Sequence, residues 1–153
     1  MIRNILLSFV FHIFILVMTG ILYLMGNHPL SLVLALLLAL LGYIAFGFVF
    51  LQPMGSVFSN LLSVSLVSSI GLLIGLYCLI FPSQMGFNWM FFLGYNLYFF
   101  GLSQALQFDP VSPVTFCFFV IPSLSLWAGL QIKVFFYKNQ DTAKRLVRFK
   151  LRK

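Results

Sequence analysis

The sequence predicts an all-α, polytopic integral membrane protein built as a bundle of membrane-spanning helices. Of its 153 residues, 62% are hydrophobic and only 7% are charged, and the mean hydropathy is +1.10. A water-facing domain would need about 25% charged residues, whereas the only acidic residues here are Asp109 and Asp141. The composition therefore favours one compact membrane domain and leaves no material for a separately folded soluble head.

Five apolar runs are each long enough for a helix of about 20 residues, the length that crosses the hydrocarbon core of a bilayer. Glycine, proline, asparagine and glutamine separate these runs and mark turns. The short turn after the first run makes the first two runs an antiparallel helical hairpin. We expect a transmembrane domain over residues 1–136 and a basic tail over 137–153, with spans at residues 5–25, 30–51, 57–81, 89–106 and 114–136.

The third run is the predicted packing centre of the bundle. Residues 55–75 (GSVFSNLLSVSLVSSIGLLIG) combine serines, an asparagine and glycines with an apolar background. Hydrocarbon cannot bond to hydroxyl or amide groups, and small residues let a second helix backbone come close. Small residues at helical spacing on three runs therefore predict helix contacts at Ser68, Gly71, Gly75, Gly94, Gly101, Ser125 and Gly129.

The second and last runs carry two further expectations. Residues 30–51 are the most lipid-like segment and are expected to face lipid broadly, with Ala35, Ala39 and Gly42 on one stripe suited to a single neighbour. Pro122 is expected to kink the last span, because proline removes a backbone donor and clashes with the preceding turn. The alternative is that the Pro122 segment is re-entrant, which leaves four spans.

Basic residues predict the orientation. Eight of the nine Lys and Arg residues lie between Lys133 and Lys153, and because translocation of such a cluster is resisted, we expect a cytoplasmic C-terminus. Five spans then place the N-terminus outside with Arg3, whereas four spans place both ends inside. The expected location is a plasma membrane or a bacterial inner membrane. The tail is either solvated or held against anionic membrane lipids through Lys144, Arg145, Arg148, Lys150, Arg152 and Lys153.

The sequence lacks the motifs that known membrane chemistries need. A membrane aspartyl protease needs two carboxylates that share a proton, and a metal site needs clustered ligands, whereas His12 and His28 lie on different elements. Residues 101–105 (GLSQA) miss the last glycine of a nucleophile elbow and lie within a span. Cys78 and Cys117 have no ligand spacing and are interpreted as small core hydrophobes. Without a phosphate loop, a dinucleotide fingerprint or a nucleic-acid module, we expect no enzyme activity, metal, cofactor or nucleic-acid partner.

Polar residues within the spans are the candidate functional residues. His12 is the one ionisable group deep in a span, and such groups are functional candidates by default. Asn60, Asn96 and Gln104 are the uncharged candidates beside it. If the four side chains converge, they line a polar cavity; if they pair separately, they only hold helices together.

Two functions from different classes fit these features. The first is a non-enzymatic accessory subunit or assembly factor of a larger membrane complex, with membrane lipids and other integral membrane proteins as partners. It is motivated by small-residue faces on three runs, more than a small bundle uses internally. The alternative is a small transporter or channel built round the polar intramembrane residues. A third, an intramembrane lipid-modifying enzyme, has only serines, histidine and Asp109 in its favour.

Overall fold

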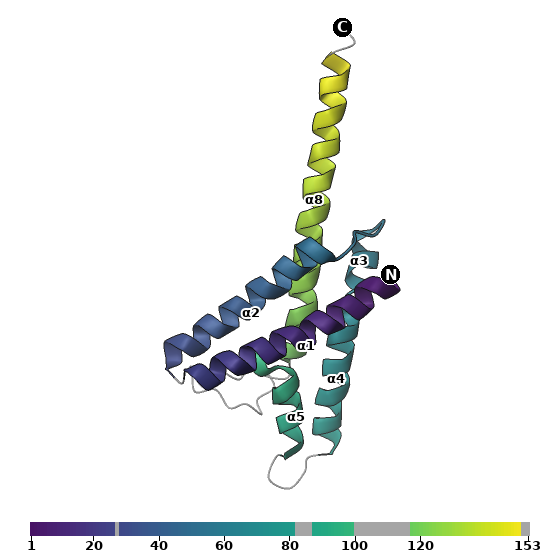
Figure 1. Ribbon diagram of the computed structural model, residues 1–153. Helices are drawn as coiled ribbons and strands as arrows, with labels where there is room; N and C mark the ends of the chain where they lie inside the picture. The colour runs from purple at the N-terminus through teal and green to yellow at the C-terminus, as the bar shows by residue number, and fades with distance from the viewer. Residues whose placement is uncertain (27, 82–86, 100–116, 151–153) are drawn as a thin grey trace.

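The computed structural model describes residues 1–26, 28–81, 87–99 and 117–150, with side chains as far as residue 139. Within these ranges all regular structure is helical, in agreement with the predicted fold class. Three stretches are long and apolar enough to cross a membrane, Ile2–Met25, Pro29–Phe50 and Cys117–Asn139, so the count of five spans is not confirmed. The helices are α1 (Ile2–Met25), α2 (Pro29–Phe50), α3 (Val57–Leu62), α4 (Ser65–Ile80), α5 (Phe87–Tyr95), the 3₁₀ helix η2 (Cys117–Val120) and α8 (Ile121–Lys150) (Figure 1).

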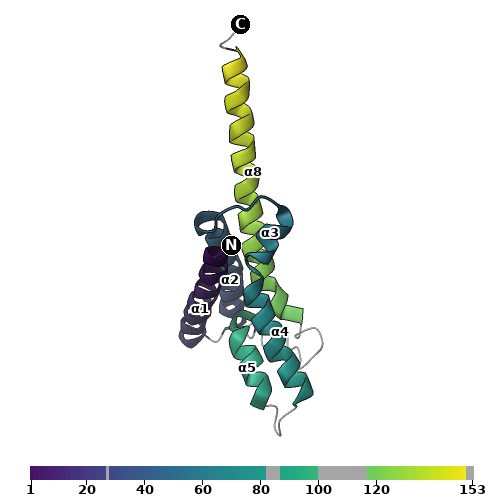
Figure 2. The same ribbon diagram turned by 90° about the vertical axis from the view of Figure 1, so that its right-hand side faces the viewer.

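Helices α1 and α2 form an antiparallel hairpin that lies obliquely across α4 and α8 (Figures 1 and 2). Pro29 begins α2 at a position where its missing N–H is not needed, and His28 Nδ1 accepts a hydrogen bond from the Leu30 amide at 3.2 Å. The hairpin brings the start of α1 beside the end of α2. There Asn4 Nδ2 donates to Gln52 O at 2.8 Å, and the Gln52 amide donates to Asn4 Oδ1 at 3.1 Å.

The predicted span over residues 57–81 is in fact two helices, α3 and α4, separated at Ser63 and Val64. The prediction of one continuous helix is wrong because serine hydroxyls offer the backbone other partners. Ser63 Oγ donates to the Asn60 carbonyl at 2.8 Å, a local bond of the kind that competes with helix continuation.

A hydroxyl from α8 bridges this break. Ser123 Oγ donates to Val64 O at 2.8 Å and accepts from the Ser68 amide at 3.2 Å. In an uninterrupted helix the Ser68 amide would bond directly to the Val64 carbonyl. The Ser123 hydroxyl is inserted between these two backbone groups and bonds to both of them. Backbone groups in apolar surroundings need such a partner from a neighbouring helix.

Helix α5 covers the first part of the predicted span over residues 89–106; Asn96 is a turn, residues 97–99 are helical again, and residues 100–106 lie outside the described residues. Helix α5 itself ends at Tyr95, and after the turn at Asn96 the Phe99 amide donates to Asn96 O at 2.8 Å. The nine residues of α5 extend for about 14 Å, roughly half of the ~30 Å hydrocarbon core. This helix alone therefore does not span a bilayer.

Pro122 lies in the first turn of α8, so the expectation of a proline kink within the last span is wrong. The first-turn amides of a helix have no partner inside it, which makes proline tolerable there. From this start α8 continues for 30 residues, about 45 Å, and the proposed boundary between residues 136 and 137 is not a helix boundary. Figure 2 shows α8 extending well beyond the rest of the bundle.

Most of α2 is exposed, in agreement with the expectation that it faces lipid broadly, and one side of it packs directly on α8. A Cβ at Gly47 would overlap the Leu126 carbonyl oxygen, and a Cβ at Gly129 would overlap the Ile44 carbonyl oxygen. The two backbones are therefore as close as glycine alone permits. Sequence analysis did not single out Gly47.

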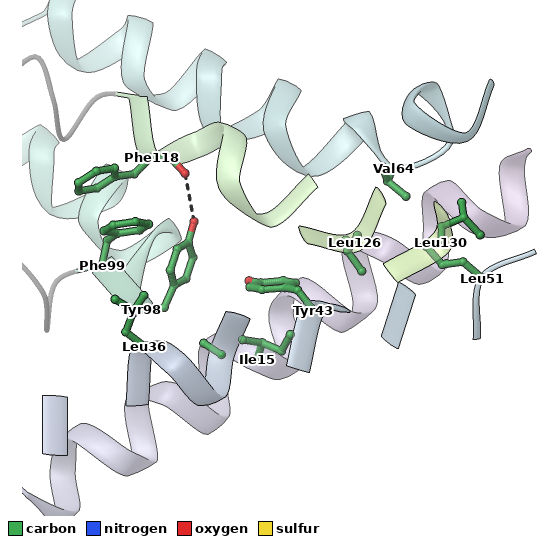
Figure 3. Packing of buried hydrophobic residues seen from close by; sticks show 11 residues of the cluster. Ile15, Leu36, Tyr43, Leu51, Val64, Tyr98, Phe99, Phe118, Leu126 and Leu130 are labelled. Atoms are coloured by element: carbon green, nitrogen blue, oxygen red, sulfur yellow. Dashed lines mark hydrogen bonds between the residues drawn. The ribbon is translucent and has the colours of Figure 1, made fainter. Parts of the chain in front are cut away.

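The main hydrophobic core lies where the hairpin crosses α8, and Figure 3 shows its side chains. A smaller cluster of Cys78, Trp89 and Phe92 joins α4 to α5. Cys117 is exposed, so only Cys78 behaves as the expected core hydrophobe. The members of the main core are Ile15, Leu36, Ala39, Tyr43, Leu51, Val64, Tyr98, Phe99, Phe118, Leu126 and Leu130.

Candidate functional site

A hydrogen-bonded histidine–tyrosine pair lies inside the bundle. His12 on α1 and Tyr43 on α2 are both fully buried, and His12 Nδ1 lies 2.7 Å from the Tyr43 hydroxyl oxygen. The ring of Tyr95 on α5 packs against the imidazole with 4.4 Å between the ring centroids. Three helices that are distant in sequence thus meet around one polar pair.

Tyr98 extends this pair towards Asn96. Its ring meets the Tyr43 ring edge-on with centroids 5.9 Å apart, and its hydroxyl lies 3.0 Å from Asn96 Oδ1 and 3.3 Å from the Phe118 carbonyl (Figure 3). Asn96 Nδ2 donates to Phe92 O at 2.9 Å, so both ends of this amide are satisfied. We call the following residues the polar core: His12, Tyr43, Tyr95, Asn96 and Tyr98.

One atom of the polar core makes no hydrogen bond among the described residues, namely His12 Nε2, which is buried. The main chain of Tyr95 lies next to the imidazole, and the Tyr95 hydroxyl donates to Val67 O at 2.8 Å. The side-chain hydrogen bond of the imidazole within the described residues is the one to the Tyr43 phenol. The described part of the chain also contains no group of three or more His, Cys, Asp or Glu suited to a metal ion.

Asn60 belongs to a separate polar cluster at the connection between α2 and α3. Its Oδ1 accepts a hydrogen bond from the Met54 amide at 2.6 Å. Its carbonyl accepts from Ser63 Oγ, and Asn4 Nδ2 reaches the same hydroxyl at 3.3 Å. These bonds fix the start of α1 to the chain that leaves α2.

The four polar candidates from the sequence are therefore distributed over different places. His12 and Asn96 lie in the polar core, Asn60 lies apart from it, and Gln104 is outside the described residues. Sequence analysis missed the tyrosines that connect the first two. Tyr43 in a leucine-rich run could have predicted such a contact, because a buried phenol needs a hydrogen-bond partner.

Two of the expected packing residues lie at very close helix contacts. A Cβ at Gly71 would lie 2.8 Å from Phe119 Cβ and 3.2 Å from the Tyr95 ring, and Gly129 faces the backbone of α2. The other positions differ: Ser68 bonds through its amide to Ser123, Gly75 is buried, Ser125 is half-buried, and Gly101 lies beyond the described ranges.

An open apolar groove of 790 Å³ lies between α1, α4 and α5. Leu16, Leu73 and Phe91 are among its lining residues, and Tyr95 links it to the polar core. Gly94 also lines the groove; it is exposed, and a Cβ there would meet nothing within 4 Å. The predicted contact at Gly94 is thus not made with any described part of this chain.

Basic side chains gather at the carboxyl end of α2. Lys133 Nζ donates to Val49 O at 3.0 Å and to Leu51 O at 2.8 Å, and Arg3 donates to Phe50 O at 3.4 Å. Cations at the end of a helix favour its partly negative carbonyls. Of the basic residues expected to face lipid, Lys144, Arg145, Arg148 and Lys150 lie on α8, and Arg152 and Lys153 follow the described residues.

Comparison of the chain with family models, curated proteins and solved structures yields no match. The function must therefore be inferred from the residues and their geometry.

Proposed function

We propose that the protein is a non-enzymatic accessory subunit or assembly factor of a larger membrane complex. The observation that supports this proposal is the open apolar groove with Gly94 at its surface. Lipid tails are as apolar as leucine, so helix association in a membrane depends on close packing at small residues. Gly94 offers such a surface, and a transmembrane helix of another integral membrane protein is the occupant that we propose.

Fewer small residues are available to a partner than the sequence alone indicates. Gly71 and Gly129 already pack against other helices of this chain, so they are not available to a partner. Among the described residues, Gly94 is the expected packing residue that meets no other part of the chain and can contact a partner. The non-enzymatic part of the proposal is supported by the sequence, which contains no recognisable catalytic motif.

Helix α5 adds a second reason to expect a partner helix. Phe87, Met90 and Phe91 on this nine-residue helix are 58%, 64% and 57% exposed. A short apolar helix with large exposed side chains needs apolar surroundings along its length. The proposed partner would cover this face, in a plasma membrane or bacterial inner membrane where the C-terminus is cytoplasmic and anionic lipids surround the basic residues.

Purification in mild detergent tests the proposal. We expect a heteromeric partner to accompany the parent protein, and Gly94→Leu to reduce its recovery at least about tenfold, the effect of a loss of about 1.4 kcal/mol of binding free energy. Because a Cβ at Gly94 meets none of the described residues of this chain within 4 Å, the variant should unfold at the same detergent or denaturant concentration as the parent.

Gly55→Leu is the matched control, since Gly55 is equally open but lies before α3 and outside the groove. It should retain the partner. Full recovery of the partner with Gly94→Leu, or a parent protein that purifies alone and monodisperse, would refute the accessory-subunit proposal.

A small transporter or channel is the second candidate, supported by the buried and unbonded His12 Nε2 beside a tyrosine that lines the groove. In liposomes this function predicts a proton or solute flux that Asn96→Leu abolishes. The absence of any flux from the folded parent protein would rule it out.

A further inference from the structure

Side chains from both ends of the chain bond to consecutive carbonyls at the end of α2. Arg3, in the first turn of α1, donates to Phe50 O, while Lys133 of α8 donates to the carbonyls of Val49 and Leu51. Neither cation reaches these oxygens unless the start of α1, the end of α2 and this part of α8 lie side by side. The start of α1, the carboxyl end of α2 and the part of α8 near Lys133 therefore lie at the same height along the bundle.

Helix α8 passes this level and continues away from the other helices. The Phe136 ring contacts the Phe48 ring, with 6.0 Å between centroids, and α8 then runs on to Lys150. Figures 1 and 2 show this continuation leaving the bundle at the end where the N-terminus lies. Both ends of the described chain thus emerge from the same end of the bundle.

We propose that this end of the bundle is its cytoplasmic face, in contact with the headgroups of the cytoplasmic leaflet, and that both termini lie in the cytoplasm. Arg3 and Lys133 lie at this level, and the other basic residues of α8 follow Lys133. Lysine and arginine next to spans stay on the cytoplasmic side, where anionic headgroups attract them. With Arg3 among them, no basic residue needs to be exported.

This arrangement requires an even number of membrane crossings, in place of the five that the sequence predicts. With α1, α2, α4 and the stretch Cys117–Asn139 as the four crossings, α5 belongs to the segment that we assign as not crossing; its nine residues cover about 14 Å. In the four-span alternative drawn from the sequence, the re-entrant segment was the one that contains Pro122. That residue instead begins a helix within one of the three stretches long enough to span, Cys117–Asn139.

Thiol labelling of the full-length protein in intact cells tests the inference. In a background with Cys78→Ala and Cys117→Ala, single cysteines are introduced by Ile2→Cys, Asn139→Cys and Pro29→Cys. All three positions are exposed, and Pro29 lies at the turn between α1 and α2, at the end of the hairpin opposite to Ile2. A membrane-impermeant maleimide should label Pro29→Cys alone.

After the cells are permeabilised, the same reagent should label Ile2→Cys and Asn139→Cys to at least about ten times their level in intact cells. That result would support the proposal, because protection then comes from the membrane and not from burial. Labelling of Ile2→Cys but not Asn139→Cys in intact cells would place the termini on opposite sides and overturn it. Labelling of both in intact cells, or of neither after permeabilisation, would also overturn it.

Discussion

Replacement of Gly129 by alanine tests whether the crossing of α2 and α8 holds the bundle together. A Cβ at Gly129 would overlap the Ile44 carbonyl oxygen and lie 2.9 Å from both the Ile44 carbonyl carbon and the Phe48 amide nitrogen. Ordinary Cβ contacts begin at 3.4 Å, so the two backbones would have to separate by at least about 0.5 Å, the difference between 3.4 and 2.9 Å, and by more to clear the carbonyl oxygen. These atoms belong to a helix backbone, and no side-chain rotation can relieve the overlap.

The expected loss of unfolding free energy comes from the side-chain packing that this separation loosens. Tyr43, Leu126 and Leu130 have exposed fractions of 0% at this crossing, and close-packed side chains lose contact energy as soon as a gap opens. Overpacking a well-packed core costs about 1 to 3 kcal/mol. Because the obstacle is backbone, we expect about 3 kcal/mol for Gly129→Ala, or roughly a 100-fold shift in the unfolding equilibrium.

The assay is a denaturant titration of the purified protein in mild detergent micelles, with helix content followed by circular dichroism. Gly94→Ala is the control, because that glycine is open; its free energy of unfolding should stay within about 0.5 kcal/mol of the parent value. If Gly129→Ala and Gly94→Ala are equally stable, the close approach of α2 and α8 is not a stabilising contact and the reasoning fails.

Two further predictions concern buried hydrogen bonds and use the same titration. Ser123→Ala should lower the free energy of unfolding by about 1 to 2 kcal/mol, because two backbone groups at the α3–α4 break lose their bridge; Ser69→Ala, whose hydroxyl bonds only within α4, should change little. Equal responses of these two variants would contradict the bridging role. Tyr43→Phe should cost a similar amount by leaving His12 Nδ1 buried without a partner, whereas the half-exposed control Tyr77→Phe should not. A silent Tyr43→Phe would show that the histidine–tyrosine bond contributes nothing to stability.

The sequence predicted a helix well where hydropathy and turn chemistry agree. The hairpin is the example: an apolar run ends at Gly26, and Pro29 begins the next helix. The break between α3 and α4 could not be predicted, because the backbone groups that it leaves open are bridged by the hydroxyl of Ser123 from a distant helix. Hydropathy averages over such a break, since one serine among leucines hardly changes the mean.

The candidate site was predictable only in part, because the sequence names polar atoms but not their partners. His12 and Asn96 were identified since each is conspicuous in an apolar run. Tyr43 and Tyr98, which connect them, count as aromatic and apolar by composition, although their hydroxyls carry the bonds. Asn4 was not predicted as a contact residue because it lies at the start of a span, where a polar side chain is common.

The face that α2 presents to α8 shows why packing in such a bundle resists prediction. In a soluble helix the polar residues mark the outer face, but in a bilayer the lipid-facing and core-facing sides are equally apolar. Small residues then carry the remaining signal, and α2 has several, including Ala35, Ala39, Gly42 and Gly47. Which of them touches a backbone depends on the partner: Gly42 meets only the Ile15 side chain at 3.5 Å, whereas Gly47 meets the backbone of Leu126. Nothing in either local sequence refers to the other, so the tertiary fold alone selects Gly47 as the position where a methyl group cannot fit.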